Sequence, residues 1–176
     1  MPPYYAVLLN GTVGAGKTTT AEALSDLEGA AGRRHAAIDL DHLRLLVPPP
    51  AGDPWGLEVE LANLRDVARN YRAAGARRFV LSGVIETAVE LGRLRAALGA
   101  GRLLVVLLEV RPEVVRARLH RRHDEDAPGL AWHLDRTGVL ADLLDQAGLE
   151  NARIDTTGRP PADVAREVRR LAGWSV

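Results

Sequence analysis

Short apolar runs alternate along the chain with longer segments in which apolar residues recur every three or four positions. The second spacing is that of an amphipathic helix, whereas an uninterrupted apolar run of strand length is typical of a strand covered on both faces. Residues 103–110, which are nearly all apolar, are the clearest example of such a strand. The pattern predicts strands at residues 5–9, 36–38, 78–82, 103–110 and 152–155.

Helices are predicted between these strands and after the last of them. Pro112 stands in the first turn of one helix, where its missing N–H costs nothing, and Gly75 and Gly99 follow the ends of two others. The prolines at 48–50 end another helix, and residues 47–56 are predicted to form a surface loop. The predicted helices span residues 18–27, 40–46, 57–74, 87–98, 112–122, 130–146 and 161–171.

Strands that alternate with helices form parallel sheets with right-handed crossovers. The expected fold class is therefore α/β, with three layers and helices on both faces of a five-stranded parallel sheet. The 176 residues fit a single domain, 1–176, whose core needs no covalent staples. The chain has no cysteine, which excludes disulfides, thiolate metal sites and cysteine nucleophiles.

Charge and hydropathy narrow the range of partners. The 23 basic and 23 acidic side chains cancel, whereas binding to a nucleic-acid backbone rests on a positive field. No apolar run approaches the ~20 residues that cross a bilayer, and the first residues lack the pattern of a signal peptide. We expect a cytoplasmic monomer or small homo-oligomer with neither a nucleic acid nor a membrane as partner.

The strongest candidate chemistry lies at residues 11–18, Gly-Thr-Val-Gly-Ala-Gly-Lys-Thr, which match the phosphate-binding pattern G-x-x-x-x-G-K-[ST]. The match follows a predicted strand and opens a predicted helix, which is the context that the pattern requires. Lys17, the only lysine of the chain, is expected to bridge the β- and γ-phosphates, and the Thr18 hydroxyl to bind Mg²⁺. The predicted nucleotide-binding residues of this loop are Gly11, Val13, Gly14, Ala15, Gly16, Lys17, Thr18 and Thr19.

Two absences distinguish between classes of P-loop protein. A GTPase needs an Asn-Lys-x-Asp guanine motif, and the chain has no second lysine to build one. Motor and transporter ATPases usually end a neighbouring strand in an acidic residue, but residues 78–82 are followed by no acid until Glu86. Both absences favour a small P-loop kinase.

With these residues the chain resembles the small P-loop kinases of the nucleoside-kinase-like group, especially shikimate kinase, gluconate kinase and chloramphenicol phosphotransferase. The resemblance covers nearly the whole chain and rests on the P-loop, on Asp39 and Asp41, on an arginine-bearing helix after the fourth strand and on residues 154–159. It implies a P-loop NTPase fold with strand order 2-3-1-4-5, a lid at about residues 112–135, and ATP with Mg²⁺ as cofactors. ATP would lie across the carboxyl ends of the strands, with the acceptor beside it.

Asp39 and Asp41 follow the second predicted strand. Two positions apart in extended chain, both carboxylates would point to one side. The resemblance implies that Asp41 is the base that accepts the acceptor's proton and that Asp39 is associated with the metal, although the two roles can be exchanged. The competing interpretation is that one of them caps the helix that follows. Arg44 is expected to orient the base or to bind an anionic acceptor, and a solvated arginine is the alternative.

Other candidate residues come from three segments. Arg118 and Arg122 lie one helical turn apart, and the resemblance implies that such arginines close over ATP; a solvated basic face is the alternative. Thr157 and Arg159 occupy the position of an adenine-binding loop, where a plain turn would use similar residues. The remaining candidates for acceptor binding or for Mg²⁺ through water follow the third strand: Ser82, Gly83 and Glu86.

The resulting hypothesis is an ATP- and Mg²⁺-dependent phosphotransferase that moves the γ-phosphate of ATP to a hydroxyl of a small molecule. One alternative is a nucleotide kinase with a phosphate acceptor, which needs no base. The other is an ATP-binding regulatory or drug-sequestering protein without turnover. The aspartate pair favours transfer, while sugar acids, antibiotics and nucleosides all remain open as acceptors.

Overall fold

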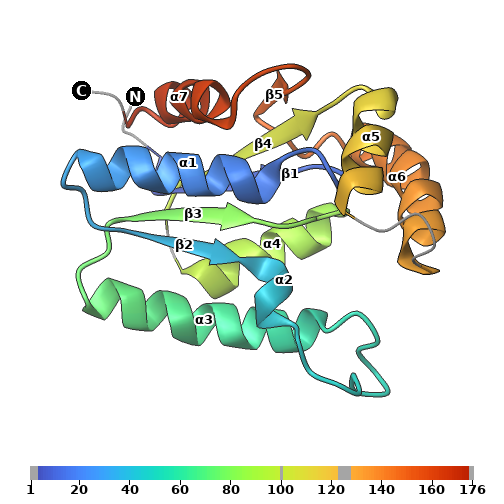
Figure 1. Cartoon of the computed structure of the whole chain (residues 1–176). Helices are drawn as coiled ribbons and strands as arrows, with labels where there is room; N and C mark the ends of the chain where they lie inside the picture. The colour runs from blue at the N-terminus through green and yellow to red at the C-terminus, as the bar shows by residue number, and fades with distance from the viewer. Residues whose placement is uncertain (1–3, 100, 123–127, 175–176) are drawn as a thin grey trace.

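A computed structural model of the chain describes residues 4–99, 101–122 and 128–174, with the backbone alone for residues 119–122 and 128–137. Its centre is one parallel sheet of five strands in the order β2-β3-β1-β4-β5 (Figure 1), which confirms the predicted order. The strands are β1 (Ala6–Asn10), β2 (His35–Asp39), β3 (Arg78–Ser82), β4 (Leu103–Glu109) and β5 (Ala152–Asp155).

Helices cover both faces of the sheet, so the fold has the three predicted layers. Figure 1 shows α1 and α7 on one face, α3 and α4 on the other, and α5 and α6 beyond the carboxyl ends of the strands. The helices are α1 (Lys17–Ala30), α2 (Leu40–Leu43), α3 (Leu57–Ala73), α4 (Ala88–Leu98), α5 (Pro112–Arg122), α6 (Pro128–Ala147) and α7 (Pro161–Leu171). No helix within the described residues is both long and apolar enough to cross a bilayer.

The central strand β1 is buried along its whole length and divides the core in two. Because successive side chains of a strand point to opposite faces, Leu8 packs in the cluster with α3 and α4, and Leu9 packs in the cluster with α1 and α7. The sheet is thus held rigidly from both sides, and the loops that follow its carboxyl ends are carried on a fixed base.

The main difference from the predicted elements is α2, which ends at Leu43 and not at residue 46. The chain turns at Arg44, where the N–H of Leu46 donates to the Arg44 carbonyl (2.8 Å). Val47 precedes Pro48, and a residue before proline disfavours the helical conformation. A short α2 leaves residues 44–56 as a loop in front of α3, with Leu45 and Val47 strongly exposed.

Candidate nucleotide and acceptor site

A cavity of about 600 Å³ opens at the carboxyl edge of the sheet, where the rule for open α/β sheets places a ligand. The P-loop forms its floor, and the end of β2, α5 and the start of α7 form its walls. The lining residues are residues 13–20, Asp39, Asp41, His42, Arg118, Thr156, Arg159, Pro161 and Val164.

Backbone geometry gives the P-loop its shape. Gly16 caps the start of α1 with a φ of 93°, a conformation that residues with a side chain rarely adopt. A Cβ on Gly11 would lie 2.6 Å from the carbonyl oxygen of Leu108, so only glycine lets the loop pack against β4. The first N–H groups of α1 therefore meet the cavity, where the helix dipole favours phosphate.

Lys17 and Thr18 begin α1 and line the cavity. The Lys17 ammonium donates hydrogen bonds to the carbonyls of Gly11 (2.8 Å) and Thr12 (2.9 Å). The Thr18 hydroxyl donates to Asp39 Oδ2 (3.2 Å), which places two hard oxygen ligands side by side. Such donors suit Mg²⁺, which prefers one or two protein oxygens together with phosphate and water. In the described part of the chain no group of three or more His, Asp or Glu side chains could hold a metal.

Helix α5 is docked on the P-loop. Val115 packs so closely that a Cβ on Gly14 would lie 3.3 Å from its Cγ1, and Arg118 Nη1 donates to the Gly14 carbonyl (2.7 Å). The guanidinium of Arg118 thus lines the cavity beside the phosphate-binding loop, and its role over ATP stays a prediction. Arg122 is the last residue of α5, and its side chain lies outside the described part of the structure.

Asp39 and Asp41 lie where β2 passes into α2, and the capping interpretation holds for Asp39. Asp39 ends β2 and caps α2, where its Oδ1 accepts from the N–H of Asp41 (3.0 Å). Asp41 lies in the first turn of α2, so the expectation that the two share a side because the chain is extended was wrong. Both nevertheless line the cavity, and the Asp41 side chain is 64% exposed.

Comparisons with known proteins place the chain in a family and a fold. A protein-family model described as an AAA domain matches residues 7–129, from β1 to the first residues of α6. The chain belongs to this AAA-domain family. No curated protein matched the sequence in a search.

Solved structures share the fold of this AAA-domain protein over nearly its whole length. A gluconokinase from Sinorhizobium meliloti 1021 has a TM-score of 0.62 at 22% identity, over 98% of this chain and 96% of that one. Shikimate kinase from Acinetobacter baumannii, in complex with shikimate, has a TM-score of 0.58 at 21% identity, over 96% and 92%. The APS kinase CysC of Mycobacterium tuberculosis, in complex with AMPPNP and APS, has a TM-score of 0.60 at 20% identity, over 98% and 99%. The predicted resemblance to gluconate and shikimate kinases is thus confirmed for the fold.

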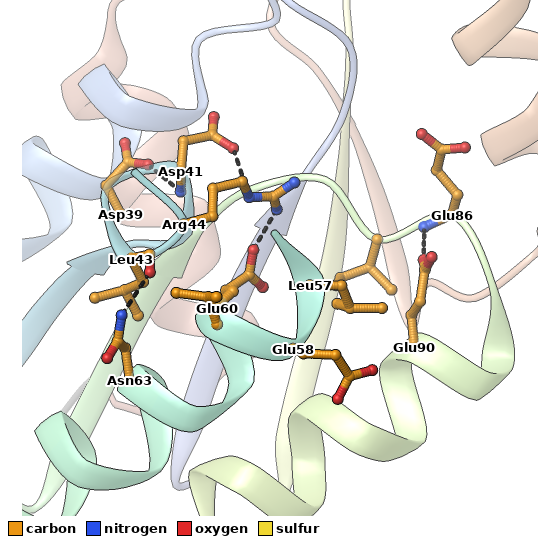
Figure 2. A network of polar contacts seen from close by, with 12 residues as sticks. Asp39, Asp41, Leu43, Arg44, Leu57, Glu58, Glu60, Asn63, Glu86 and Glu90 are labelled. Atoms are coloured by element: carbon orange, nitrogen blue, oxygen red, sulfur yellow. Dashed lines mark hydrogen bonds and ion pairs between the residues drawn. The ribbon is translucent and has the colours of Figure 1, made fainter. Parts of the chain in front are cut away.

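Arg44 lies outside the cavity lining, in a polar network behind Asp41 (Figure 2). Its Nε is 3.7 Å from Asp41 Oδ1, and its Nη2 forms an ion pair with the carboxylate of Glu60 on α3. The Glu60 side chain is fully buried. Burial raises the pKa of Glu60 to about 7, against the opposing effect of the Arg44 charge.

The candidates that follow β3 do not line the cavity. Ser82 is buried at the end of the strand, and Gly83 lies beneath α2, where a Cβ would be 2.7 Å from Leu40 Cδ1. Glu86 is half-buried in the loop before α4, and its backbone N–H donates to Glu90 Oε2 (2.9 Å). Their assignment to acceptor binding stays a prediction.

The adenine-loop candidates lie between β5 and α7. Arg159 lines the cavity and is held by Glu167 on α7 (2.8 Å), whereas Thr157 faces the start of α5 and accepts from the N–H of Arg111 (3.1 Å). At the end of β5, separate hydrogen bonds from the hydroxyl and the backbone N–H of Thr157 lower the pKa of the Asp155 carboxyl.

Sequence reasoning missed two buried polar residues that join the loops of the site. The Thr156 hydroxyl contacts the carbonyls of Ala15 and Glu109 (3.0 Å each), which ties the loop after β5 to the P-loop. Asn10, at the end of β1, bonds both backbone groups of Ile85 (2.9 and 3.2 Å). A polar residue at the end of a fully buried strand was the signal available for Asn10.

Proposed function

We propose that the protein is an ATP- and Mg²⁺-dependent phosphotransferase that moves the γ-phosphoryl group of ATP to a hydroxyl of a small molecule. The observation that carries this proposal is the exposed carboxylate of Asp41 in the same cavity as Lys17, Thr18, Asp39 and Arg118. Thr18 and Asp39 already supply the oxygen ligands for Mg²⁺, so the additional carboxylate of Asp41 is accounted for by a role in transfer. The fold likeness to a gluconokinase, a shikimate kinase and an APS kinase supports the same class.

Each side chain has a separate task in the proposed reaction. The N–H groups at the start of α1 and the Lys17 ammonium bind the phosphates, and Arg118 adds positive charge beside the transferring group. Thr18 and Asp39 would hold Mg²⁺, which neutralises phosphate charge when bound. Asp41 accepts the proton of the acceptor hydroxyl. The hydroxyl oxygen forms a bond to the γ-phosphorus of ATP, and the bond between the γ-phosphorus and the β-phosphate oxygen breaks.

The nucleotide half of the proposal is tested by thermal unfolding. Mg²⁺ with ATP should raise the melting temperature, because a ligand that binds the folded state stabilises it by mass action. Lys17→Ala should abolish most of that rise. An equal rise in the variant would contradict the assignment of residues 11–18 as the phosphate site.

The transfer half is tested at Asp41 with a panel of hydroxyl acceptors. Asp41→Asn keeps the shape of the side chain but removes its basicity, so turnover should fall at least ~100-fold while stabilisation by Mg²⁺ and ATP persists. Asp66→Asn is a matched control, since this exposed aspartate of α3 pairs only with its neighbour Arg69 (3.0 Å) in the described contacts. Turnover of Asp41→Asn within about threefold of wild type would contradict the base assignment. Transfer to nucleotide phosphates alone would support a nucleotide kinase. The absence of turnover with any acceptor would support a protein that only binds ATP.

A further inference from the structure

Glu60 has no role assigned by its sequence position, yet it lies directly behind the proposed base. It sits one turn into α3 with a side chain that is fully buried, and its Oε2 forms an ion pair with Arg44 Nη2. No hydrogen-bond donor of the described residues reaches its Oε1. A carboxylate buried with a single ionic partner costs stability, so its presence is explained by what it does to that partner.

Arg44 transmits the position of Glu60 to Asp41. Figure 2 shows the guanidinium between the two carboxylates, with Nη2 toward Glu60 and Nε toward Asp41. Asp41 and Arg44 are only three residues apart, and an exposed ion pair of this kind holds its partners loosely. The guanidinium of Arg44 is rigid and planar, so the ion pair of its Nη2 with the buried Glu60 carboxylate also fixes the direction of its Nε. The exposed carboxylate of Asp41 thereby gains a fixed cation beside it.

An alternative explanation is that Glu60 and Arg44 only hold α2 in place. However, α2 is also fastened to α3 by contacts that carry no charge. Asn63 Nδ2 donates to the Leu43 carbonyl (2.8 Å), and a Cβ on Gly56 would lie 2.9 Å from Arg44 Cβ. These contacts place the α2 backbone without any charge. Asn63 therefore offers a control that separates holding the helix from orienting the carboxylate.

We propose that Glu60 is a positioning residue for phosphoryl transfer, which acts through Arg44 to hold the Asp41 carboxylate toward the acceptor hydroxyl. The inference rests on the proposed function, since it assumes that Asp41 is the base. It also gives Arg44 a task other than binding an anionic acceptor, because two carboxylates already share its guanidinium.

The first test is the kinetics of Glu60→Gln, which keeps the size of the side chain and removes its charge. A misoriented base should lower kcat about 10- to 100-fold and leave the KM for ATP unchanged. Restoring a carboxylate with Glu60→Asp should recover part of the loss. In the Asp41→Asn background, Glu60→Gln should cost nothing further, because there is no base left to orient.

Two matched variants separate this role from general support of the fold. Asn63→Ala removes a fastening of α2 but leaves the charges, and Glu58→Gln removes an exposed carboxylate of the same helix that pairs with Arg93 (2.6 Å). Both should keep kcat within about threefold of wild type. A loss in Asn63→Ala equal to that of Glu60→Gln, or full additivity of the Asp41 and Glu60 changes, would overturn the proposal.

Crystal structures of wild type and Glu60→Gln give a readout that does not depend on turnover. The proposal expects Arg44 to leave the side of Asp41 in the variant and to stay there in wild type. An unmoved Arg44 with kcat within threefold would overturn the inference and leave the proposed function standing. Absence of transfer by wild type to any hydroxyl acceptor would instead refute the proposed function, and an unmoved Arg44 would then still refute the positioning role.

Discussion

At the scale of single residues, Glu60 is an ionisable side chain on the apolar face of a helix. It lies three residues after Leu57 and four before Leu64, on the side of α3 that packs against the sheet. Its pKa is raised by burial from 4.5 to about 7, so near neutral pH the folded protein holds this proton more tightly than the unfolded chain does. The linkage between proton binding and folding makes that shift measurable.

The raised pKa of Glu60 predicts that the free energy of unfolding falls as pH rises. Between pH about 4.5 and about 7 the folded state binds more protons at this site than the unfolded state, so its contribution to the free energy of unfolding falls and then levels off above pH 7. The fall corresponds to about 3 kcal/mol over that window. Glu60→Gln should remove it, as measured by urea unfolding at pH 5 and pH 8.

Glu58→Gln is the control for this pH series. The hydrogen bond from Arg93 lowers the pKa of Glu58, so its contribution to stability is gained as pH rises toward the unfolded value of 4.5 and changes little between pH 5 and pH 8. Its substitution should leave the difference between pH 5 and pH 8 as in wild type. Parallel stability profiles for wild type and Glu60→Gln would show that Glu60 does not titrate in this window.

The site residues divide into those visible in the sequence and those made by tertiary contacts. Residues 11–18 could be predicted because a phosphate loop is contiguous and its spacing is fixed by the backbone. Thr156 and Asn10 act on partners 141 and 75 residues away, which no local pattern reports. Glu60 is visible in the sequence as an acidic residue on the apolar face of a helix. Its connection to Asp41 through Arg44 depends on tertiary contacts that the sequence does not show.

At the scale of elements, the position of α2 decides where Asp41 lies. Leu40 begins this helix, is fully buried, and rests on Gly83 of the loop after β3. Element order and type were predicted well because periodicity is strong over strands and long helices. The extent of α2 was not, since a single turn has no periodicity and ends where the chain turns at Arg44.

Gly83→Ala should therefore displace α2. The new Cβ would lie 2.7 Å from Leu40 Cδ1 and 2.9 Å from its Cβ, so the helix must move. We expect a loss of about 1–3 kcal/mol in unfolding free energy and a lower kcat, with the stabilisation by Mg²⁺ and ATP retained. Urea unfolding, steady-state kinetics and thermal shifts measure the three quantities.

Gly92→Ala is the matched substitution on α4. A Cβ there meets nothing within 4 Å, so the change should stabilise the helix by about 0.5–1 kcal/mol and leave kcat unaltered. Wild-type kcat in Gly83→Ala would mean that α2 can shift without moving the carboxylate of Asp41, the proposed base. The positioning of Asp41 would then rest on Arg44 alone.

At the scale of the whole molecule, a second ionic cluster lies at the end of the sheet opposite the cavity. Glu28, near the end of α1, is fully buried and contacts Arg33 (3.7 Å), Arg78 at the start of β3 and Arg169 on α7 (2.8 Å). Arg78 also lies over the Trp174 ring (5.0 Å). One carboxylate thus joins a strand to the two helices that cover its face.

Glu28→Gln should test whether this end carries stability and no function. Loss of the carboxylate leaves three half-buried arginines without their shared counter-ion, so the free energy of unfolding should fall by about 3 kcal/mol in urea titrations. Asp66→Asn, which breaks the exposed pair with Arg69, should cost less than about 1 kcal/mol. Below its melting temperature Glu28→Gln should bind Mg²⁺ and ATP as wild type does, because Glu28 lies near the end of α1 opposite Lys17, and Lys17 is held by carbonyls of the P-loop. A weaker nucleotide affinity in the folded variant would show instead that the two ends of α1 are coupled. A stability loss no larger than that of Asp66→Asn would show that water solvates the three arginines well enough without Glu28.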